Sequence, residues 1–201
     1  MPPPLHLYRA VAAFADGEQE QLHRWRSTVR LPSNVPYVVD NLWEYLRPDA
    51  MPCRRHAVYA SPSAALALAN ASGDDRGRGF AAYRVEVSGY CRVAQLTVKD
   101  ARLHPDIRRM LRLVQRRQPE WALLPLPARQ KIGMAFAPAT SKAELVALAG
   151  EEPALVAFLA EAAALCTLWT DSRTEPVDAE GELFFELAPD ASYRLLPLTA
   201  A

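Results

Sequence analysis

Three short groups of polar residues along the chain have side chains that can bind or stabilise charge. Arg9 lies in an apolar stretch near the amino terminus, Ser61 and Ser63 flank a proline, and Glu180 and Glu182 flank a glycine. A guanidinium binds phosphate oxygens through paired hydrogen bonds. A carboxylate can stabilise positive charge or accept a proton. Together these side chains could bind an anionic substrate and act on it.

The order of these groups resembles the arginine–serine–glutamate class of ADP-ribosyltransferases. In that family an arginine lies on the first core strand, a serine-x-serine motif follows, and an ExE motif completes the set. The matching residues here are Leu7-Tyr8-Arg9, Ser61-Pro62-Ser63 and Glu180-Gly181-Glu182. The resemblance spans nearly the whole chain but rests on these short motifs. It implies one domain over residues 1–201, with a split β-sheet core and a helical insertion.

The resemblance also implies NAD as substrate and a role for each residue. Arg9 would bind the pyrophosphate of NAD, because a planar guanidinium fits phosphate oxygens better than an ammonium does. Glu182 would stabilise the positive charge that develops on the ribose as the bond to nicotinamide breaks. Glu180 would orient or deprotonate an arginine of the acceptor protein. Ser61 would hold the catalytic glutamate and the ribose in place.

Two further residues complete the predicted NAD site, namely Ser63 of the serine motif and Tyr59, whose ring could stack on a base. The sequence departs from the family pattern in having proline inside the serine motif and Glu186 as a second carboxylate near the ExE pair. Structural explanations compete with the catalytic ones. Ser61 could instead cap a helix, and the ExE tripeptide could be a solvated turn.

The function that this resemblance implies is transfer of a single ADP-ribose from NAD to a protein side chain, with arginine as the expected acceptor. Hydrolysis of NAD would be the side reaction when no acceptor is present. Such a protein could act as a bacterial effector or toxin, with an immunity or chaperone protein as partner. We expect it in the cytoplasm, or delivered into another cell without a cleavable signal peptide.

Two other functions compete with this one. A predicted helix over residues 106–118 carries five arginines opposite its apolar face, and such a face could follow nucleic-acid phosphates. No aromatic interleaving supports that interpretation, so nucleic acid is not the expected partner. The second alternative is a protein-interaction module that has kept the fold and lost the activity.

Composition excludes several classes of protein. The 201 residues carry 23 basic and 23 acidic side chains, so no overall field favours nucleic acid or an anionic membrane. Cys53, Cys91 and Cys166 are odd in number and widely spaced, which argues against disulfides and a zinc site, and no metal is expected. The apolar run 154–169 contains Glu161 and is too short to span a bilayer, so no membrane contact is expected.

Hydrophobic periodicity predicts an α+β domain with strands at both ends of the chain and helices between them. The predicted strands are 5–11, 57–60, 80–87, 91–98, 183–187 and 193–198. Strands 80–87 and 91–98 should form a hairpin through Ser88-Gly89-Tyr90. The predicted helices are 18–29, 38–46, 64–71, 106–118, 141–150 and 153–169. Ser61 is the expected cap of helix 64–71, Asp106 that of helix 106–118, and Ser141 opens a capping box.

Overall fold

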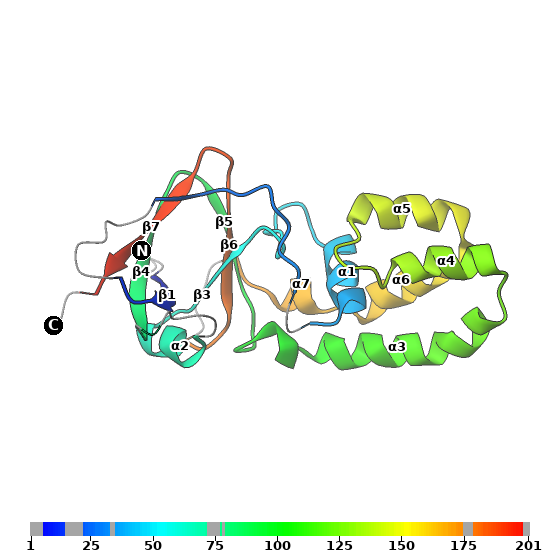
Figure 1. Ribbon diagram of the computed structural model, residues 1–201. Helices are drawn as coiled ribbons and strands as arrows, with labels where there is room; N and C mark the ends of the chain where they lie inside the picture. Colours follow the sequence, from blue (N-terminus) through cyan, green and yellow to red (C-terminus); the bar gives the residue numbers. More distant parts are fainter. Residues whose placement is uncertain are drawn as a thin grey trace. The chain divides into compact units, whose positions relative to one another are not determined.

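The computed structural model describes residues 6–14, 22–32, 35–71, 77, 79–174 and 179–198. It mixes helices with antiparallel sheets, which confirms the α+β class (Figure 1). Contacts divide the chain into two compact units. We call residues 1–28, 50–99 and 172–201 the strand unit, and residues 29–49 and 100–171 the helix unit.

The strand unit contains two antiparallel sheets. Among the described residues its strands are β1 (Leu7–Ala12), β2 (His23–Arg24), β3 (Val58–Ala60), β4 (Phe80–Ser88), β5 (Cys91–Gln95), β6 (Leu183–Leu187) and β7 (Ser192–Pro197). The four-stranded sheet has the order β1-β4-β7-β2, and the three-stranded sheet has the order β3-β6-β5. An isolated bridge between Tyr8 and Ser61 joins the two sheets where β1 passes the end of β3.

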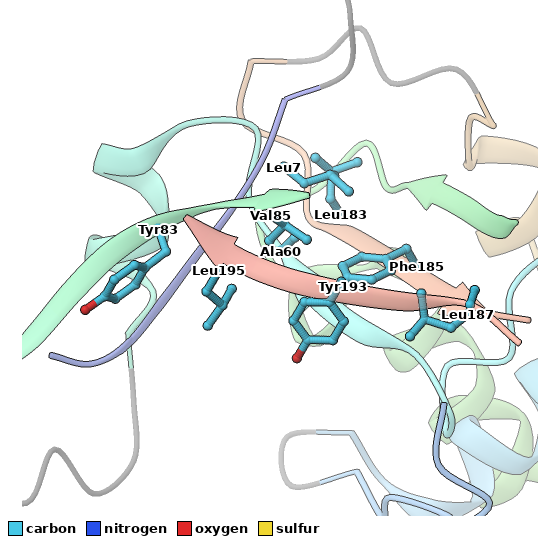
Figure 2. Packing of buried hydrophobic residues seen from close by; sticks show 10 residues of the cluster. Leu7, Ala60, Tyr83, Val85, Leu183, Phe185, Leu187, Tyr193 and Leu195 are labelled. Atoms are coloured by element: carbon cyan, nitrogen blue, oxygen red, sulfur yellow. The ribbon is translucent and has the colours of Figure 1, made fainter. Parts of the chain in front are cut away.

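A single hydrophobic cluster draws on both sheets, and Figure 2 shows its side chains converging. Alternation along each strand selects the residues that face it, because successive side chains point to opposite faces. From β6 these are Leu183, Phe185 and Leu187, and Phe185 meets the ring of Tyr193 edge to face at 5.5 Å. Burying each of these large apolar side chains contributes about 1.5–3 kcal/mol.

The predicted hairpin between residues 80–87 and 91–98 is wrong, because β4 and β5 belong to different sheets. β4 pairs with β1 and β7, whereas β5 pairs with β6. Gly89 forms the corner between the sheets with φ of +93°, and a Cβ there would lie 3.0 Å from the Cβ of Ala191. The segment Ser88-Gly89-Tyr90 therefore redirects the chain from one sheet to the other.

Two local predictions near the amino-terminal half also need correction. Helix α2 (Ala64–Ala69) is capped by Ser63, whose Oγ accepts the Leu66 N–H at 3.2 Å, while the backbone of Ser61 pairs with Tyr8. The predicted helix 18–29 begins outside the described residues, and its described part is not helical. There His23–Arg24 forms β2 on the edge of β7 instead, so sheet pairing overrides local helix propensity.

The helix unit consists of α1 (Tyr37–Tyr45), a 3₁₀ turn (Ala101–Leu103), α3 (Pro105–Ala122), α4 (Leu126–Met134), α5 (Lys142–Glu151), α6 (Pro153–Leu165) and α7 (Leu168–Asp171). Helix α3 begins one residue earlier than expected, because the cap is His104, whose Nδ1 accepts the Asp106 N–H at 3.3 Å. The capping box that Ser141 forms with Glu144 is confirmed. Helices α5 and α6 follow each other closely and pack together.

Asp106 has a structural role in this unit instead of the expected capping role. Its carboxylate is fully buried and accepts hydrogen bonds from Trp43 Nε1 at 3.1 Å, from Thr167 N at 3.0 Å and from Leu168 N at 2.9 Å. The indole of Trp169 donates in turn to the backbone carbonyl of Trp43 at 2.7 Å. One carboxylate therefore ties α1, α3 and the start of α7 together.

The segment Pro153–Asp171 is long and apolar enough to cross a membrane, with a mean hydropathy of 1.6. A core helix of a soluble protein passes the same test. Here α6 ends at Leu165 and α7 begins at Leu168, and α6 buries Leu155, Phe158 and Leu159 inside the helix unit. The expectation of no membrane contact stays a prediction.

Candidate functional site

Ser61 and Glu182, two of the predicted site residues, lie where the strands β1, β3 and β6 meet. Tyr8 and Ser61 exchange both backbone hydrogen bonds, at 2.9 and 2.8 Å. Ala60 on β3 is paired with Leu183 on β6, so the antiparallel register sets Ser61 opposite Glu182. The segments that carry the arginine, serine and glutamate motifs are therefore neighbours across β1, β3 and β6.

Three of the predicted residues share one face of the three-stranded sheet. Ala60 and Leu183 point into the hydrophobic cluster, so alternation turns Tyr59, Ser61 and Glu182 to the opposite face, which we call the outer face. Ser61 is buried there and Glu182 is half-buried. The structure thus places the carboxylate of Glu182 on the same face as the phenol of Tyr59 and the hydroxyl of Ser61, which lie far from it in the sequence.

The sequence did not reveal two further residues of the outer face. Phe184 lies beside Tyr59, with 5.9 Å between the ring centroids. The buried guanidinium of Arg54 lies over both rings, at 5.5 Å from the Tyr59 centroid and 5.4 Å from that of Phe184. Alternation within β6 could have identified Phe184, whereas no pattern in the sequence marks Arg54, which lies in a turn.

The ExE tripeptide has different surroundings at each position. Glu180 is 64% exposed and forms an ion pair with Lys99, Oε2 to Nζ, at 3.0 Å. Gly181 is buried, and its carbonyl accepts a hydrogen bond from Gln95 Nε2 at 3.2 Å. The backbone of Glu182 bonds to Leu96 and Val98. The tripeptide is therefore held by hydrogen bonds against the end of β5 and the residues that follow this strand, and it is not merely a solvated turn.

Replacing Gly181 by alanine should destabilise the protein by about 1–3 kcal/mol, as overpacking of a tight site does. A Cβ at this position would overlap the carbonyl oxygen of Leu96 and lie 3.0 Å from Gln95 Cγ. The midpoint of thermal unfolding should fall by roughly 2–10 °C. Gly133→Ala is the matched control, because a Cβ there meets nothing within 4 Å. Equal midpoints for the two variants would contradict the close approach.

Arg9 lies on the other face of its strand. Tyr8 pairs with Ser61, so the next residue, Arg9, turns to the side of β1 that carries Leu7. Its Nη1 donates to the hydroxyl of Tyr193 at 2.6 Å, and its guanidinium lies 5.9 Å from that ring centroid. The structure therefore does not bring the Arg9 side chain onto the outer face.

The surroundings of Arg9 are positively charged. His23 stacks on Tyr193, with 4.5 Å between the centroids and 13° between the ring planes. Partial burial lowers the pKa of His23, and the charges of Arg9 and Arg26 lower this pKa further. In the described part of the chain no carboxylate pairs with Arg9. An anion would therefore be attracted to this region.

We expect NMR titration to give His23 a pKa below 6.5, because the folded environment disfavours the imidazolium form. The unfolded chain then binds more protons, so the contribution of His23 to stability is complete above pH 6.5 and is lost as the pH falls from 6.5 through the lower pKa of the folded state. Arg9→Gln should raise the pKa of His23, and Arg24→Gln should raise it less. A pKa at or above 6.5 in the unmodified protein would contradict this arrangement.

The remaining predicted residue and the competing carboxylate have structural partners. The Ser63 hydroxyl is engaged as the cap of α2. Glu186 accepts the Cys53 N–H through Oε2 at 2.8 Å, and the same oxygen lies 3.6 Å from Arg92 Nη1. Glu186 is therefore held by a backbone N–H and lies beside a guanidinium.

The arginines of α3 are largely committed to ion pairs. Arg109 pairs with Asp106, Arg116 with Glu161, and Arg117 with both Glu120 and Glu161. Arg108 and Arg112 remain exposed on the helix. Pairing removes much of the positive field that a nucleic-acid surface needs. Nor does any cluster of three or more His, Cys, Asp or Glu residues in the described ranges suit a metal ion.

Comparisons with known proteins find no relative: no protein-family model, no curated protein and no solved structure matches the chain. The function of the chain must therefore be inferred from its own residues and their geometry. Within this geometry, Tyr8, Ser61 and Glu182 form a row across β1, β3 and β6.

Proposed function

We propose that the protein transfers a single ADP-ribose from NAD to a protein side chain. The observation that carries this proposal is the meeting of β1, β3 and β6 at the row Tyr8, Ser61 and Glu182. Each of these strands brings one of the three motifs of the arginine–serine–glutamate class. The division into two sheets, and the helices inserted between β5 and β6, agree with the split core and helical insertion that the resemblance implies.

Glu182 is the proposed catalytic carboxylate. When the bond between nicotinamide and ribose breaks, nicotinamide leaves with the bonding electrons and positive charge develops on the ribose. A half-buried carboxylate stabilises that charge more strongly than a fully solvated one, because less water screens it. Ser61, opposite Glu182 in the register, is suited to position the ribose or the carboxylate.

Glu180 is the proposed acceptor-binding residue. It is exposed and forms an ion pair with an exposed lysine, Lys99, so an incoming guanidinium can compete with this lysine for the carboxylate. The acceptor nitrogen then forms the new bond to the ribose carbon and loses a proton to the carboxylate. Where no acceptor is bound, water takes its place and NAD is hydrolysed.

Arg9 is the proposed ligand of the NAD phosphates. It is one residue from Tyr8 in the row and two residues from Leu7 in the hydrophobic cluster. Its partner within the described chain is the neutral hydroxyl of Tyr193, so its charge is not neutralised there by a carboxylate. Because the Arg9 side chain does not lie on the outer face with Ser61, NAD would have to pass around the edge of β1 for its phosphates to reach Arg9 while its ribose lies at Ser61.

The direct test is release of nicotinamide from NAD by the purified protein, measured with and without a cell lysate that supplies acceptors. The proposal expects slow release without lysate and labelled protein bands when labelled NAD and lysate are both present. A thermal shift on addition of NAD should accompany release, since a ligand that binds the folded state stabilises it. No release and no shift under both conditions would overturn the proposal.

A further inference from the structure

The strand β5 has one edge that no described strand covers. It is an outer strand of the three-stranded sheet, and β6 pairs with its other edge. Of the described helices and strands, β6 alone packs extensively against β5. A strand edge presents backbone N–H and C=O groups in a row, and these groups can pair with another extended chain. The chemistry of this edge can therefore be stated residue by residue.

Hydrogen bonds at the end of β5 show which backbone groups face this edge. Gln95 exchanges both backbone hydrogen bonds with Arg173, at 2.8 and 2.9 Å, on the side away from β6. The next residue, Leu96, donates at 2.9 Å to the carbonyl of the residue that precedes β6. Backbone groups alternate in direction along a strand. The N–H and C=O groups of Cys91 and Val93 therefore point away from β6, and no described residue bonds to them there. We call this part of β5 the free edge.

Arg173 shows how this side of β5 accepts a chain. It lies antiparallel to β5 and exchanges with Gln95 the two hydrogen bonds of one ladder position. A segment added in the same direction would make the same two bonds to Val93 and again, two residues further on, to Cys91. The free edge thus has room for an extended segment of about three residues.

The side chains of β5 specify what such a segment carries. Cys91 and Val93 pack against the hydrophobic cluster, so the residues opposite them would extend this cluster and should be apolar. Arg92 points to the opposite, outer face, and its side chain is 42% exposed. Its Nη1 lies 3.6 Å from Glu186 Oε2, a single contact that leaves guanidinium donors for a second carboxylate. The residue opposite Arg92 should therefore be acidic.

We propose that the free edge of β5 binds a partner protein by strand addition. The partner supplies an extended segment with the pattern apolar–acidic–apolar, antiparallel to β5. Main-chain hydrogen bonds to Cys91 and Val93 provide affinity, and the pairing of the acidic residue with Arg92 provides selectivity. This binding involves neither NAD nor Glu182, so the inference goes beyond the proposed function.

A second copy of this chain is the less suitable occupant. The antiparallel pairing that uses both free positions of each copy sets Cys91 of one copy opposite Val93 of the other. The two Arg92 side chains would then lie directly opposite each other. Like charges at such a position destabilise a sheet. Arg92 therefore disfavours self-association and favours an acidic partner segment.

Amide hydrogen exchange, followed by NMR, tests the edge directly. In the protein alone the amides of Cys91 and Val93 should exchange fast, whereas those of Arg92 and Ala94, which face β6, should be protected. The probe is a blocked peptide of sequence Thr-Val-Glu-Val-Thr. Saturating peptide should slow exchange at Cys91 and Val93 at least about tenfold. Protection of these two amides in the protein alone, or no effect of the peptide, would overturn the proposal.

Two related peptides separate strand addition from other modes of binding. Replacing the central Glu of the peptide by Lys should weaken binding about fivefold, because a like charge then lies opposite Arg92. N-methylation at both valines of the peptide should abolish binding, because it removes the N–H donors that pair with the carbonyls of Cys91 and Val93. Binding of either related peptide as tight as that of the parent peptide would contradict the proposed geometry.

A pair of variants at Cys91 tests the protein side of the same bonds. Cys91→Pro removes an N–H that points to the free edge and not to β6, so the sheet keeps its own hydrogen bonds. Peptide binding should weaken about threefold to tenfold, the effect of one lost hydrogen bond. Cys91→Ala is the matched control, because it keeps the N–H, and it should bind as the parent protein does. Equal binding by the two variants, at equal unfolding midpoints, would overturn the proposal.

Sedimentation velocity distinguishes the two occupants. The proposal expects a monomer, whereas a dimer in which the Cys91 and Val93 amides are protected would give the edge to a second copy and overturn the partner. Nicotinamide release from NAD should be the same in Cys91→Pro and in the parent protein. A peptide that fails to bind therefore leaves the proposed transferase standing, and a lack of nicotinamide release leaves strand addition standing.

Discussion

Replacing Glu182 by glutamine should reduce nicotinamide release from NAD by about a hundredfold to a thousandfold, the usual effect of removing one electrostatic stabiliser of a transition state. The change keeps the size of the side chain and removes its negative charge. The backbone bonds of Glu182 to Leu96 and Val98 do not involve the side chain, so the protein should still fold. Release is measured at saturating NAD, with the unfolding midpoint as the check on folding.

Two neighbouring carboxylates give the controls for this experiment. Glu180→Gln should leave nicotinamide release without acceptor nearly unchanged and should remove transfer to protein, because this glutamate is exposed on the acceptor side. Glu186→Gln should keep both activities, since the Glu186 carboxylate accepts the Cys53 N–H and forms an ion pair with Arg92. Full activity in Glu182→Gln, or loss of activity in Glu186→Gln alone, would make the assignment of the catalytic carboxylate wrong.

Replacing Asp106 by alanine should destabilise the helix unit by about 3–5 kcal/mol, the range for breaking a buried charged network. The change leaves the indole N–H of Trp43 and the backbone N–H groups of Thr167 and Leu168 without this acceptor. Each buried donor left unsatisfied costs about 1–3 kcal/mol. Thermal unfolding should begin roughly 6–20 °C lower.

The near-ultraviolet circular dichroism of Trp43 and Trp169 measures the unfolding of the helix unit, since both indoles form buried hydrogen bonds there. Asp106→Asn keeps one acceptor oxygen and should lose less stability than Asp106→Ala. Asp100→Ala is the matched control on the same segment, because the hydrogen bond that the Arg102 N–H donates to Asp100 Oδ1 is exposed. A midpoint for Asp106→Ala within 2 °C of the control value would contradict the role given to this carboxylate.

Local patterns predicted most elements but not how the strands pair. Alternation identified the strand around Leu183–Leu187, and cap chemistry identified the helix that follows Ser141. The hairpin through Gly89 failed because the same turn residues suit a tight reversal and a corner between sheets. The choice is made by partners far away in sequence, namely β1 and β7 for β4.

The site was predictable to a similar degree. Tyr59, Ser61 and Glu182 come together because strand alternation and one antiparallel register act on all three. The direction of Arg9 depends on the bridge between Tyr8 and Ser61, and a shift of one residue in that bridge would reverse it. The buried Arg54 over Tyr59 and Phe184 results from a turn whose position no local pattern indicates.

The strand unit is built from distant parts of the chain, and this affects how the protein folds during its synthesis. In the three-stranded sheet β6 is the central strand, flanked by β3 and β5, yet it follows both of them and all the helices in the sequence. Contacts of such long sequence separation form slowly and expose unpaired strand edges until the last strand arrives. Because Glu182 directly precedes β6, a nascent chain on the ribosome would lack the proposed catalytic carboxylate until its sheets can close. Synthesis itself would then delay any consumption of NAD until folding is nearly complete.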